Sequence, residues 1–392
     1  MKKNILKSVL AICTLIFAAC TNKQEQNTDL TSSLEKQNNE TVQEKNVTPQ
    51  DDRIYIKFLY EKNYGLLDSK LNIIEKNNYR DIFLINDNIF FLDANEVRIT
   101  DLDLKPKAEV KMNADNKIMN IFYLIDDFYC LKMFDTNDIV YNMKSGESVS
   151  YGQLDSNHSN KSTSFMQPVW TRGYYVSLLD GKQYFNDRNY EKTFQFSNGL
   201  AAVLKEDWSK ALINEDGTII LDDVVNCGKA FTNGLMPVIT EKTSGYINGN
   251  GEFVFNCDLV DEDWRTNVSG RPTLRGSFTE DYAYVHTKDN CWTIMAMDGT
   301  IIKDNIPYET RSDGFSCGLI NVYSNGKSGY ANRSGELAIP MVFDSSEDFS
   351  NGYAMVIYQG ENGILDTNGN VYLCKDLLSG NKKPFVNVTD IQ

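Results

Sequence analysis

The feature that most constrains the fold of this chain is a short pattern that recurs five times in its second half. Each copy begins with Phe, has a turn residue three places later and continues into an apolar stretch. The copies are FSNGLAAV from Phe196, FTNGLMPV from Phe231, FTEDYAYV from Phe278, FSCGLINV from Phe315 and FSNGYAMV from Phe349. Successive copies begin 35, 47, 37 and 34 residues apart. Similarity at such a period indicates a repeat architecture, in which each unit completes its core against its neighbours.

A second landmark stays in phase with the first. Each Phe is followed, 20 or 21 residues later, by a glycine in a turn-like setting, namely Gly217, Gly251, Gly299, Gly335 and Gly369. The fourth place of the pattern also predicts a left-handed turn residue, because it holds Gly199, Gly234, Gly318 and Gly352 in four copies and Asp281 in the fifth.

Between these landmarks the residue types predict three short strands. The alternating stretch after the fourth place is typical of a strand with one buried face. A polar tip and a second strand follow, and Asp-Gly, Asn-Gly or Ser-Gly then favours a tight turn into a third strand. A three-stranded antiparallel meander of about 35 residues is too small to be stable alone, so we expect stacked neighbours to complete the core.

These units resemble the WG repeat family of bacteria, in which an F-S-x-G-L-A-x-V strand pairs with a W-G-Y-I-D-x-x-G hairpin. The W-G-Y triplet stands here as Lys210-Ala211-Leu212, Ser244-Gly245-Tyr246, Trp292-Thr293-Ile294, Ser328-Gly329-Tyr330 and Asn362-Gly363-Ile364. The resemblance covers residues 196 to 374, and Tyr64-Gly65-Leu66-Leu67-Asp68 indicates that the series begins near residue 54. It implies an all-β fold, either propeller-like or an open β superhelix, and we favour the propeller-like arrangement.

The pattern divides the folded part into two regions. Residues 191–378 form the WG repeat region with five units, and residues 379–392 are expected to be a C-terminal tail. Residues 51–190 are interpreted as a diverged β-repeat region, because alternating runs persist where the family pattern cannot be aligned. About eight units of roughly 40 residues would fit in all, and the absence of a long 3.6-residue period predicts little helix.

The N-terminal residues predict export and a lipid anchor. A basic start precedes the apolar stretch 5–19, which is too short to cross a bilayer as a helix. The stretch ends Phe17-Ala18-Ala19-Cys20, which resembles a bacterial lipobox; ordinary cleavage that happens to leave a cysteine is the alternative. We therefore expect residues 1–19 to be a lipoprotein signal peptide and Cys20 to hold the protein on a membrane through its lipid. This places the protein in the bacterial cell envelope, on the outer membrane or the cell surface.

Residues 20–50 are expected to be a disordered tether. Residues 21–50 contain no aromatic residue and no glycine, so they cannot form a core. A flexible coil of this length reaches on the order of 30 Å. A disordered tail without a role would have the same composition.

Composition argues against several classes of function. The chain has 39 basic and 54 acidic residues and a formal net charge of −15, so a nucleic-acid partner is not expected. Its only histidines, His158 and His286, cannot build a multi-histidine metal site and leave little material for a His-dependent triad. No cofactor motif is present either. We therefore expect no metal, no cofactor and no catalytic residues.

Six cysteines remain after Cys13 and Cys20, and they are spread through the repeats as Cys130, Cys227, Cys257, Cys291, Cys317 and Cys374. No pair forms C-x-x-C, which disfavours redox and zinc-ribbon motifs. Exported proteins often contain disulfides, but core positions are the favoured interpretation here.

One insertion is a candidate ligand-binding loop. Gly251 and Phe278 are 27 residues apart, whereas the same gap is 14 to 16 residues in the neighbouring units. The inserted residues lie within 256–277, and the candidates among them are Asp261, Asp263, Trp264 and Arg265. Loops on a rigid scaffold are common places for specificity. A solvated excursion is the alternative.

Together these patterns predict a non-enzymatic, membrane-anchored envelope lipoprotein whose WG repeat domain binds a protein or a glycan. The alternative is a propeller-type hydrolase of glycans or peptides that uses an acidic pair. Two carboxylates about 5 to 9.5 Å apart catalyse glycoside cleavage, and this spacing cannot be seen in a sequence.

Overall fold

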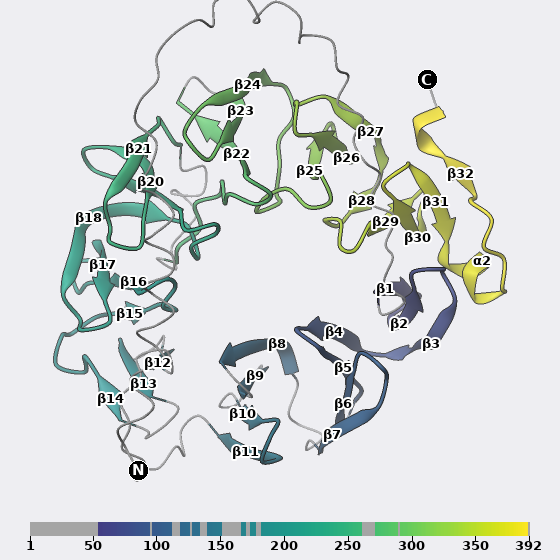
Figure 1. Cartoon of the computed structure of the whole chain (residues 1–392), viewed down its shortest axis with the longest axis horizontal. Helices are drawn as coiled ribbons and strands as arrows, with labels where there is room; N and C mark the ends of the chain where they lie inside the picture. The colour runs from purple at the N-terminus through teal and green to yellow at the C-terminus, as the bar shows by residue number, and fades with distance from the viewer. Residues whose placement is uncertain are drawn as a thin grey trace, which may run out of the picture. The chain divides into compact units, whose positions relative to one another are not determined.

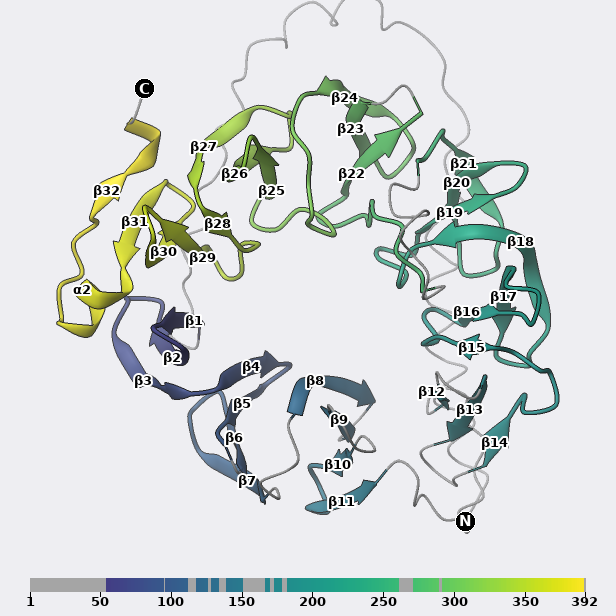
Figure 2. The same cartoon turned by 180° about the vertical axis from the view of Figure 1, so that it is seen from behind.

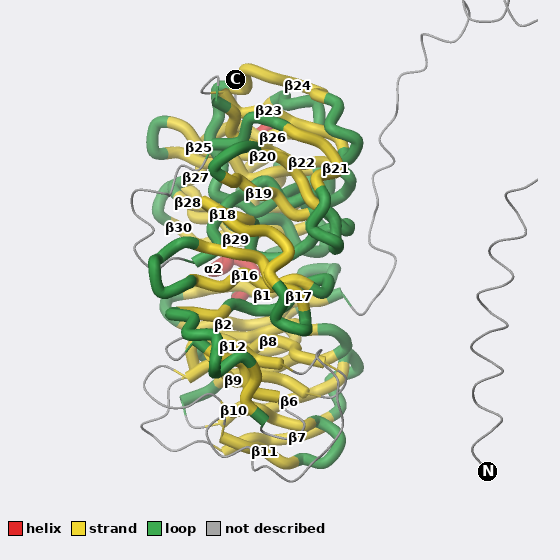
Figure 3. The backbone as a smooth tube through the Cα atoms, turned by 90° about the vertical axis from the view of Figure 1, so that its left-hand side faces the viewer, coloured by secondary structure: helices red, strands yellow, loops and turns green. Residues whose placement is uncertain are grey.

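The computed structural model describes residues 54–94, 96–111, 118–125, 128–133, 139–150, 166–169, 173–177, 182–260, 271–288 and 291–390. The chain separates into two parts, Met1–Val47 and Thr48–Gln392, and all described residues belong to the second. These residues form small antiparallel sheets with very little helix, as Figure 3 shows by colour. The prediction of an all-β fold built from short antiparallel repeats is confirmed.

The N-terminal half contains four of the eight sheets found among the described residues. They consist of β1 (Tyr55–Tyr60), β2 (Asn63–Asp68) and β3 (Ile73–Tyr79); β4 (Asp81–Ile85), β5 (Asn88–Leu92), β6 (Glu96–Asp101) and β7 (Pro106–Lys111); β8 (Ile118–Ile125), β9 (Phe128–Met133), β10 (Ile139–Asn142) and β11 (Glu147–Ser150); and β12 (Met166–Val169), β13 (Tyr174–Ser177) and β14 (Gln183–Tyr184).

One larger sheet follows, in which β18 pairs on both sides and joins two meanders. It consists of β15 (Lys192–Thr193), β16 (Leu200–Leu204), β17 (Lys210–Asn214), β18 (Ile219–Cys227), β19 (Met236–Thr240), β20 (Ser244–Ile247) and β21 (Phe253–Asn256).

Three further sheets complete the described part. They consist of β22 (Tyr282–Thr287), β23 (Cys291–Ala296) and β24 (Ile301–Ile306); β25 (Leu319–Ser324), β26 (Lys327–Asn332) and β27 (Leu337–Phe343); and β28 (Ser345–Ser346), β29 (Tyr353–Tyr358), β30 (Glu361–Asp366), β31 (Asn370–Leu373) and β32 (Val386–Asn387). Helix α2 (Cys374–Leu378) and the short 3₁₀ helix η2 (Val388–Asp390) flank β32. Residues 379–390, which were expected to be a tail, thus contribute β32 to the outer edge of β31.

All five copies of the repeat pattern begin with the same tight turn. Its two central residues have positive φ in each copy, for example +48° at Asn198 and +82° at Gly199, and +49° at Glu280 and +69° at Asp281. The flanking residues pair across it, as Ser197 does with Leu200. Two left-handed residues in succession define the type I′ hairpin turn, so the predicted left-handed residue is present, Asp281 included.

The five repeat phenylalanines lie in similar surroundings, each against the preceding unit. Four of them contact a buried tyrosine there, at ring-centroid distances of 4.9 Å (Phe196–Tyr175), 4.7 Å (Phe278–Tyr246), 6.5 Å (Phe315–Tyr284) and 4.7 Å (Phe349–Tyr330). The fifth, Phe231, packs against the core between β16–β18 and β19–β20.

The tyrosines also bond to the next unit. Their hydroxyls donate to backbone carbonyl oxygens at 2.7 Å (Tyr175 to Phe194), 2.5 Å (Tyr246 to Gly276), 2.6 Å (Tyr284 to Tyr308) and 2.6 Å (Tyr330 to Glu347). Tyr246 and Tyr330 are the tyrosines of the W-G-Y triplet, so the triplet joins units as well as forming a strand.

The turn glycines provide a second contact between units. A Cβ on Gly251 would lie 2.4 Å from Ile220 Cγ2 of the preceding meander. Gly217 is placed in the same way against Phe185, and Gly299 against Phe255. These positions therefore require both a left-handed residue and the absence of a side chain.

Seven of the hydrophobic clusters in the described part lie between two successive meanders. The clusters join β1–β3 to β4–β7, β4–β7 to β8–β11, β12–β14 to β16–β17, and then each later meander to the next. The core is thus distributed along the series, as expected for repeats that complete one another.

The first sheet packs against the last. Ile56, Phe58 and Leu67 share a cluster with Ile364 and Leu377. The Tyr353 hydroxyl donates to the Ser69 carbonyl oxygen at 3.1 Å. Figures 1 and 2 both place β1–β3 beside β29–β31 and α2. This contact joins the two ends of the series, as a propeller-like arrangement requires and an open superhelix does not.

Candidate functional site

The site residues named from the sequence fall outside the described residues. Asp261, Asp263, Trp264 and Arg265 lie in 261–270, and Cys20 lies before residue 54. The described ends of the insertion are held on the scaffold, since the Val260 N–H donates to the His286 carbonyl oxygen and the Leu274 N–H donates to that of Cys227, both at 3.0 Å. The candidate loop therefore stays a prediction.

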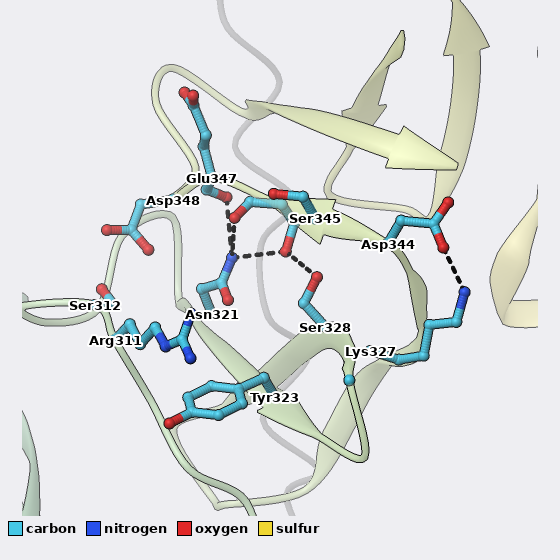
Figure 4. A pocket seen from close by; sticks show the side chains of 12 residues that line it. Arg311, Ser312, Asn321, Tyr323, Lys327, Ser328, Asp344, Ser345, Glu347 and Asp348 are labelled. Carbon is cyan, nitrogen blue, oxygen red and sulfur yellow. Dashed lines mark hydrogen bonds and ion pairs between the residues drawn. The ribbon is translucent and has the colours of Figure 1, made fainter. Parts of the chain in front are cut away.

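A described pocket lies elsewhere, between the sheet β25–β27 and the start of the last sheet. We call it the β25–β28 pocket, and its volume is about 570 Å³. Figure 4 shows its lining, which consists of Arg311, Ser312, Asn321, Tyr323, Gly326, Lys327, Ser328, Asp344, Ser345, Ser346, Glu347 and Asp348. Nearly all of these residues are polar.

A hydrogen-bond network fixes one wall of the pocket. Asn321 Nδ2 donates to the Ser346 carbonyl oxygen at 3.0 Å and to Ser346 Oγ at 2.7 Å. Ser346 Oγ donates in turn to Ser328 Oγ at 2.7 Å. These bonds join β25, β26 and β28, so the short strand β28 is held in place by side chains as well as by its ladder.

Strand register shows why this pocket is open. Asn321 lies opposite Tyr330, and Tyr323 opposite Ser328. In the preceding unit the equivalent positions are held by Tyr284 and Trp292, whose rings stack at 5.3 Å. The amide of Asn321 and the hydroxyl of Ser328 thus stand in place of two aromatic rings, and these smaller side chains line the pocket.

The charged side chains of the pocket are of two kinds. Lys327 Nζ lies 2.5 Å from Asp344 Oδ1, and this hydrogen bond holds the pKa of the Asp344 carboxyl below its usual value. The Arg311 guanidinium lies 4.6 Å from the centre of the Tyr323 ring. Arg311 thus covers the one aromatic ring that faces the pocket.

The remaining acids, Glu347 and Asp348, form no ion pair with any of the residues that the structure describes. Partial removal from water raises the pKa of both carboxyls. The Ser312 hydroxyl partly offsets this effect at Asp348, and the Lys57 ammonium does so at Glu347. Figure 4 shows the two side chains leaving successive residues in different directions. They do not face each other across the pocket.

A smaller pocket shares these two acids. It has a volume of about 260 Å³ and lies where β1 and β4 approach the segment before β29. We call it the closure pocket. Glu347 and Asp348 thus line both the β25–β28 pocket and the closure pocket.

The six cysteines in the described part are free thiols, and Cys227 and Cys374 are fully buried. Burial raises the pKa of each of these two thiols to about 12. The favoured interpretation of cysteines as core residues is confirmed for Cys130, Cys227 and Cys374, whereas Cys317 is exposed. Within the described ranges no group of His, Cys, Asp and Glu is arranged to hold a metal ion, and no helix has the length and hydropathy needed to span a bilayer.

Sequence reasoning did not find the β25–β28 pocket. Its only available signal was Ser328 at the place of Trp in the repeat, with Asn321 in the strand beside it. The same triplet position is also serine in Ser244, which is buried and donates to the Cys257 carbonyl oxygen. A missing Trp alone therefore does not predict a pocket.

Comparison with solved structures gives broad but weak likenesses. A computationally designed protein, Ika8, matches at 10% identity and a TM-score of 0.37, over 73% of this chain and 82% of that one. A eukaryotic initiation factor matches at 12% identity and a TM-score of 0.46, over 81% of this chain and 94% of that one. BamB from Moraxella catarrhalis matches at 12% identity and a TM-score of 0.41, over 71% of this chain and 93% of that one. These TM-scores are too low to support a functional argument.

Sequence comparison is more specific, although it covers little of the chain. No curated protein matches this sequence. A family model described as a WG containing repeat matches residues 329–360, from the Gly of the fourth triplet to the β29–β30 turn. Over this stretch, which adjoins the pocket at Ser328, the chain is similar to the WG containing repeat.

Proposed function

We propose that the repeat domain is a non-enzymatic binding scaffold and that the β25–β28 pocket holds a glycan. The observation that carries this proposal is that Asn321 and Ser328 stand where the preceding unit has the stacked rings of Tyr284 and Trp292. Amide, hydroxyl, guanidinium and carboxylate groups line the pocket, and such groups bond well to sugar hydroxyls. Its volume of about 570 Å³ is within the range of small-ligand sites.

We further propose that the protein works at a membrane of the bacterial cell envelope, held there by a lipid on Cys20 and a tether over residues 20–50. The lipobox-like sequence supports this proposal. Replacing Cys20 by Ser should move the protein from the membrane fraction to the soluble fraction, or leave an uncut precursor. Unchanged fractionation would contradict the anchor without bearing on the pocket.

The pocket is tested with a glycan array and a variant that fills it. Ser328→Trp restores the aromatic residue that the preceding unit has at this place, so we expect it to remove glycan binding. Ser334→Trp is the matched control, because Ser334 is exposed in a turn of the same sheet. Loss of binding in both variants, or in neither, would contradict the assignment of the pocket.

A protein partner is the other outcome of this experiment. Pull-downs with the same two variants separate the cases. Capture of one protein by the wild type and Ser334→Trp, but not by Ser328→Trp, together with an empty glycan array, would replace the glycan by a protein surface. Failure of both assays would remove the binding proposal for this pocket.

A hydrolase is the second candidate. The raised pKa values of Glu347 and Asp348 favour it, because a protonated carboxyl can act as a general acid. The divergent directions of the two side chains argue against it. We expect no release of reducing ends from a bound glycan. Release that Glu347→Gln abolishes would favour the hydrolase.

A further inference from the structure

The closure pocket has apolar walls that come from both ends of the chain. Ile56 lies on β1, Phe83 and Ile85 on β4, and Met355 on β29. Phe83, Ile85 and Met355 are only partly buried, so they leave apolar surface facing the hollow. At about 260 Å³ the pocket is smaller than most drug-sized sites, and it suits one side chain or one small molecule.

The charges beside these walls are unbalanced. Lys57 is engaged, since its Nζ lies 3.0 Å from Asp81 Oδ1 and 4.6 Å from the centre of the Tyr64 ring. Glu347 and Asp348 line the same pocket, and in the described part of the chain neither makes an ion pair. A further carboxylate, that of Asp313, lies near Asp348, but it is neutralised by Lys229, whose Nζ lies 3.1 Å from Asp313 Oδ2. The pocket therefore has one cation, Lys57, and the three carboxyl groups of Asp81, Glu347 and Asp348 around it, so acidic groups outnumber cations.

We infer that the closure pocket binds an aliphatic cation, such as a lysine side chain or another alkylammonium group. The alkyl stem would lie along Ile56, Phe83 and Met355, and the ammonium would meet the carboxyl of Glu347, which is the acid on the side of Lys57 and Asp81. An anion would meet two carboxylates, and a neutral alkyl chain would leave them unpaired beside an apolar wall. This inference is independent of the proposed function, because the apolar walls belong to a different pocket.

The closure pocket can be probed with n-hexylamine, which is cationic at neutral pH, and with n-hexanol as a neutral compound of equal length. Binding is followed on the full chain through the methyl resonances of Met355 and Ile56. We expect hexylammonium to shift both resonances in a saturable manner and with at least tenfold higher affinity than hexanol. Equal responses to the two compounds, or no saturable shift, would overturn the inference.

Substitutions of the acidic residues test which carboxyl group binds the ammonium. We expect Glu347→Gln to weaken hexylammonium binding at least tenfold and Asp348→Asn to weaken it less, whereas Asp344→Asn leaves it unchanged, because Asp344 lines only the other pocket. A retained methyl spectrum shows that each variant is folded. Undiminished binding in Glu347→Gln would overturn the inference. Glycan binding by the β25–β28 pocket can succeed or fail separately, so the two proposals are distinguishable.

Discussion

At the scale of single residues, the repeat pattern records how one unit contacts the preceding one. The repeat phenylalanine packs on the preceding unit, a tyrosine there donates to a carbonyl close to it, and the turn glycine lies under a side chain of the same neighbour. These positions recur because each has the same geometric task in most units, although Phe231 packs on a core cluster and Gly369 lies against Thr389, later in the chain. A residue that only formed its own strand would tolerate more substitution.

Gly251→Ala tests this argument. The substitution places Cβ in a left-handed residue, which costs about 1 to 2 kcal/mol, and also 2.4 Å from Ile220 Cγ2. Ile220 is 37% exposed and can move aside, so crowding adds about 1 kcal/mol, the low end of the cost of overpacking. We expect a loss of about 2 to 3 kcal/mol in the free energy of unfolding, measured with denaturant.

Gly199→Ala is the control for Gly251→Ala. Gly199 has φ of +82°, but no atom lies within 4 Å of a Cβ built there. The loss should therefore be limited to about 1 to 2 kcal/mol from the backbone. Equal losses at the two glycines would show that the contact with Ile220 has no energetic role.

The cysteines give a second prediction at this scale. Cys317 is exposed, whereas Cys227 and Cys374 are buried with pKa values raised to about 12. A neutral-pH reaction with a thiol reagent, followed by peptide mass spectrometry, should modify Cys317 well before either buried residue. Early modification of Cys227 or Cys374 in the native protein would contradict the described core.

Residue patterns explain both the success and the limit of sequence analysis. The five units with turn glycines could be predicted, because glycine at a left-handed position is easily recognised. In the first two sheets the equivalent positions are Leu71 and Leu104, with φ of +58° and +60°. Leu71 is buried in the cluster that joins the first sheet to the last, so its packing offsets the strain, and a leucine at this place conceals the repeat.

At the scale of elements, the alternation of apolar residues was enough to predict three strands per unit. It could not predict that β18 would pair on both sides, since this depends on where the chain turns after Cys227. Nor could it predict the candidate pocket, because Asn321, Ser328 and Ser346 come together only when β25, β26 and β28 are aligned.

The segment between β28 and β29 gives a prediction about pH. Desolvation raises the pKa of Glu347 in the folded protein, so the native state binds a proton more readily than the unfolded state does. Between the unfolded and the folded pKa this carboxyl therefore makes stability fall as pH rises. Below both pKa values the Glu347 carboxyl is protonated in the folded and in the unfolded state, so it does not lower the stability.

Glu347→Gln should remove this contribution. We expect the variant to be more stable than the wild type at pH 7 and equal to it at pH 3, as measured by the midpoint of thermal unfolding. Asp344→Asn should behave in the opposite way, because the folded-state pKa of Asp344 is lowered by Lys327. It should lose stability at pH 7 and match the wild type once Asp344 is protonated. The same sign in both variants would contradict these environments.

At the scale of the whole Thr48–Gln392 part, the main finding is that the first sheet packs against the last. The sequence left a closed propeller and an open superhelix as alternatives, because closure depends on small angles between units that no local pattern records. The structure supplies the contact directly, through Phe58 and Ile364 in one cluster. The closure pocket exists only because these ends meet.

A double-mutant cycle between Phe58→Leu and Ile364→Val tests this closure most directly. If the two side chains pack together, their effects on the free energy of unfolding should be coupled by at least about 0.5 kcal/mol. Phe58→Leu combined with Ile320→Val, in the cluster between β22–β24 and β25–β26, should be additive within about 0.5 kcal/mol. Additivity in both cycles would contradict the contact between the first and last sheets, and with it the closed arrangement.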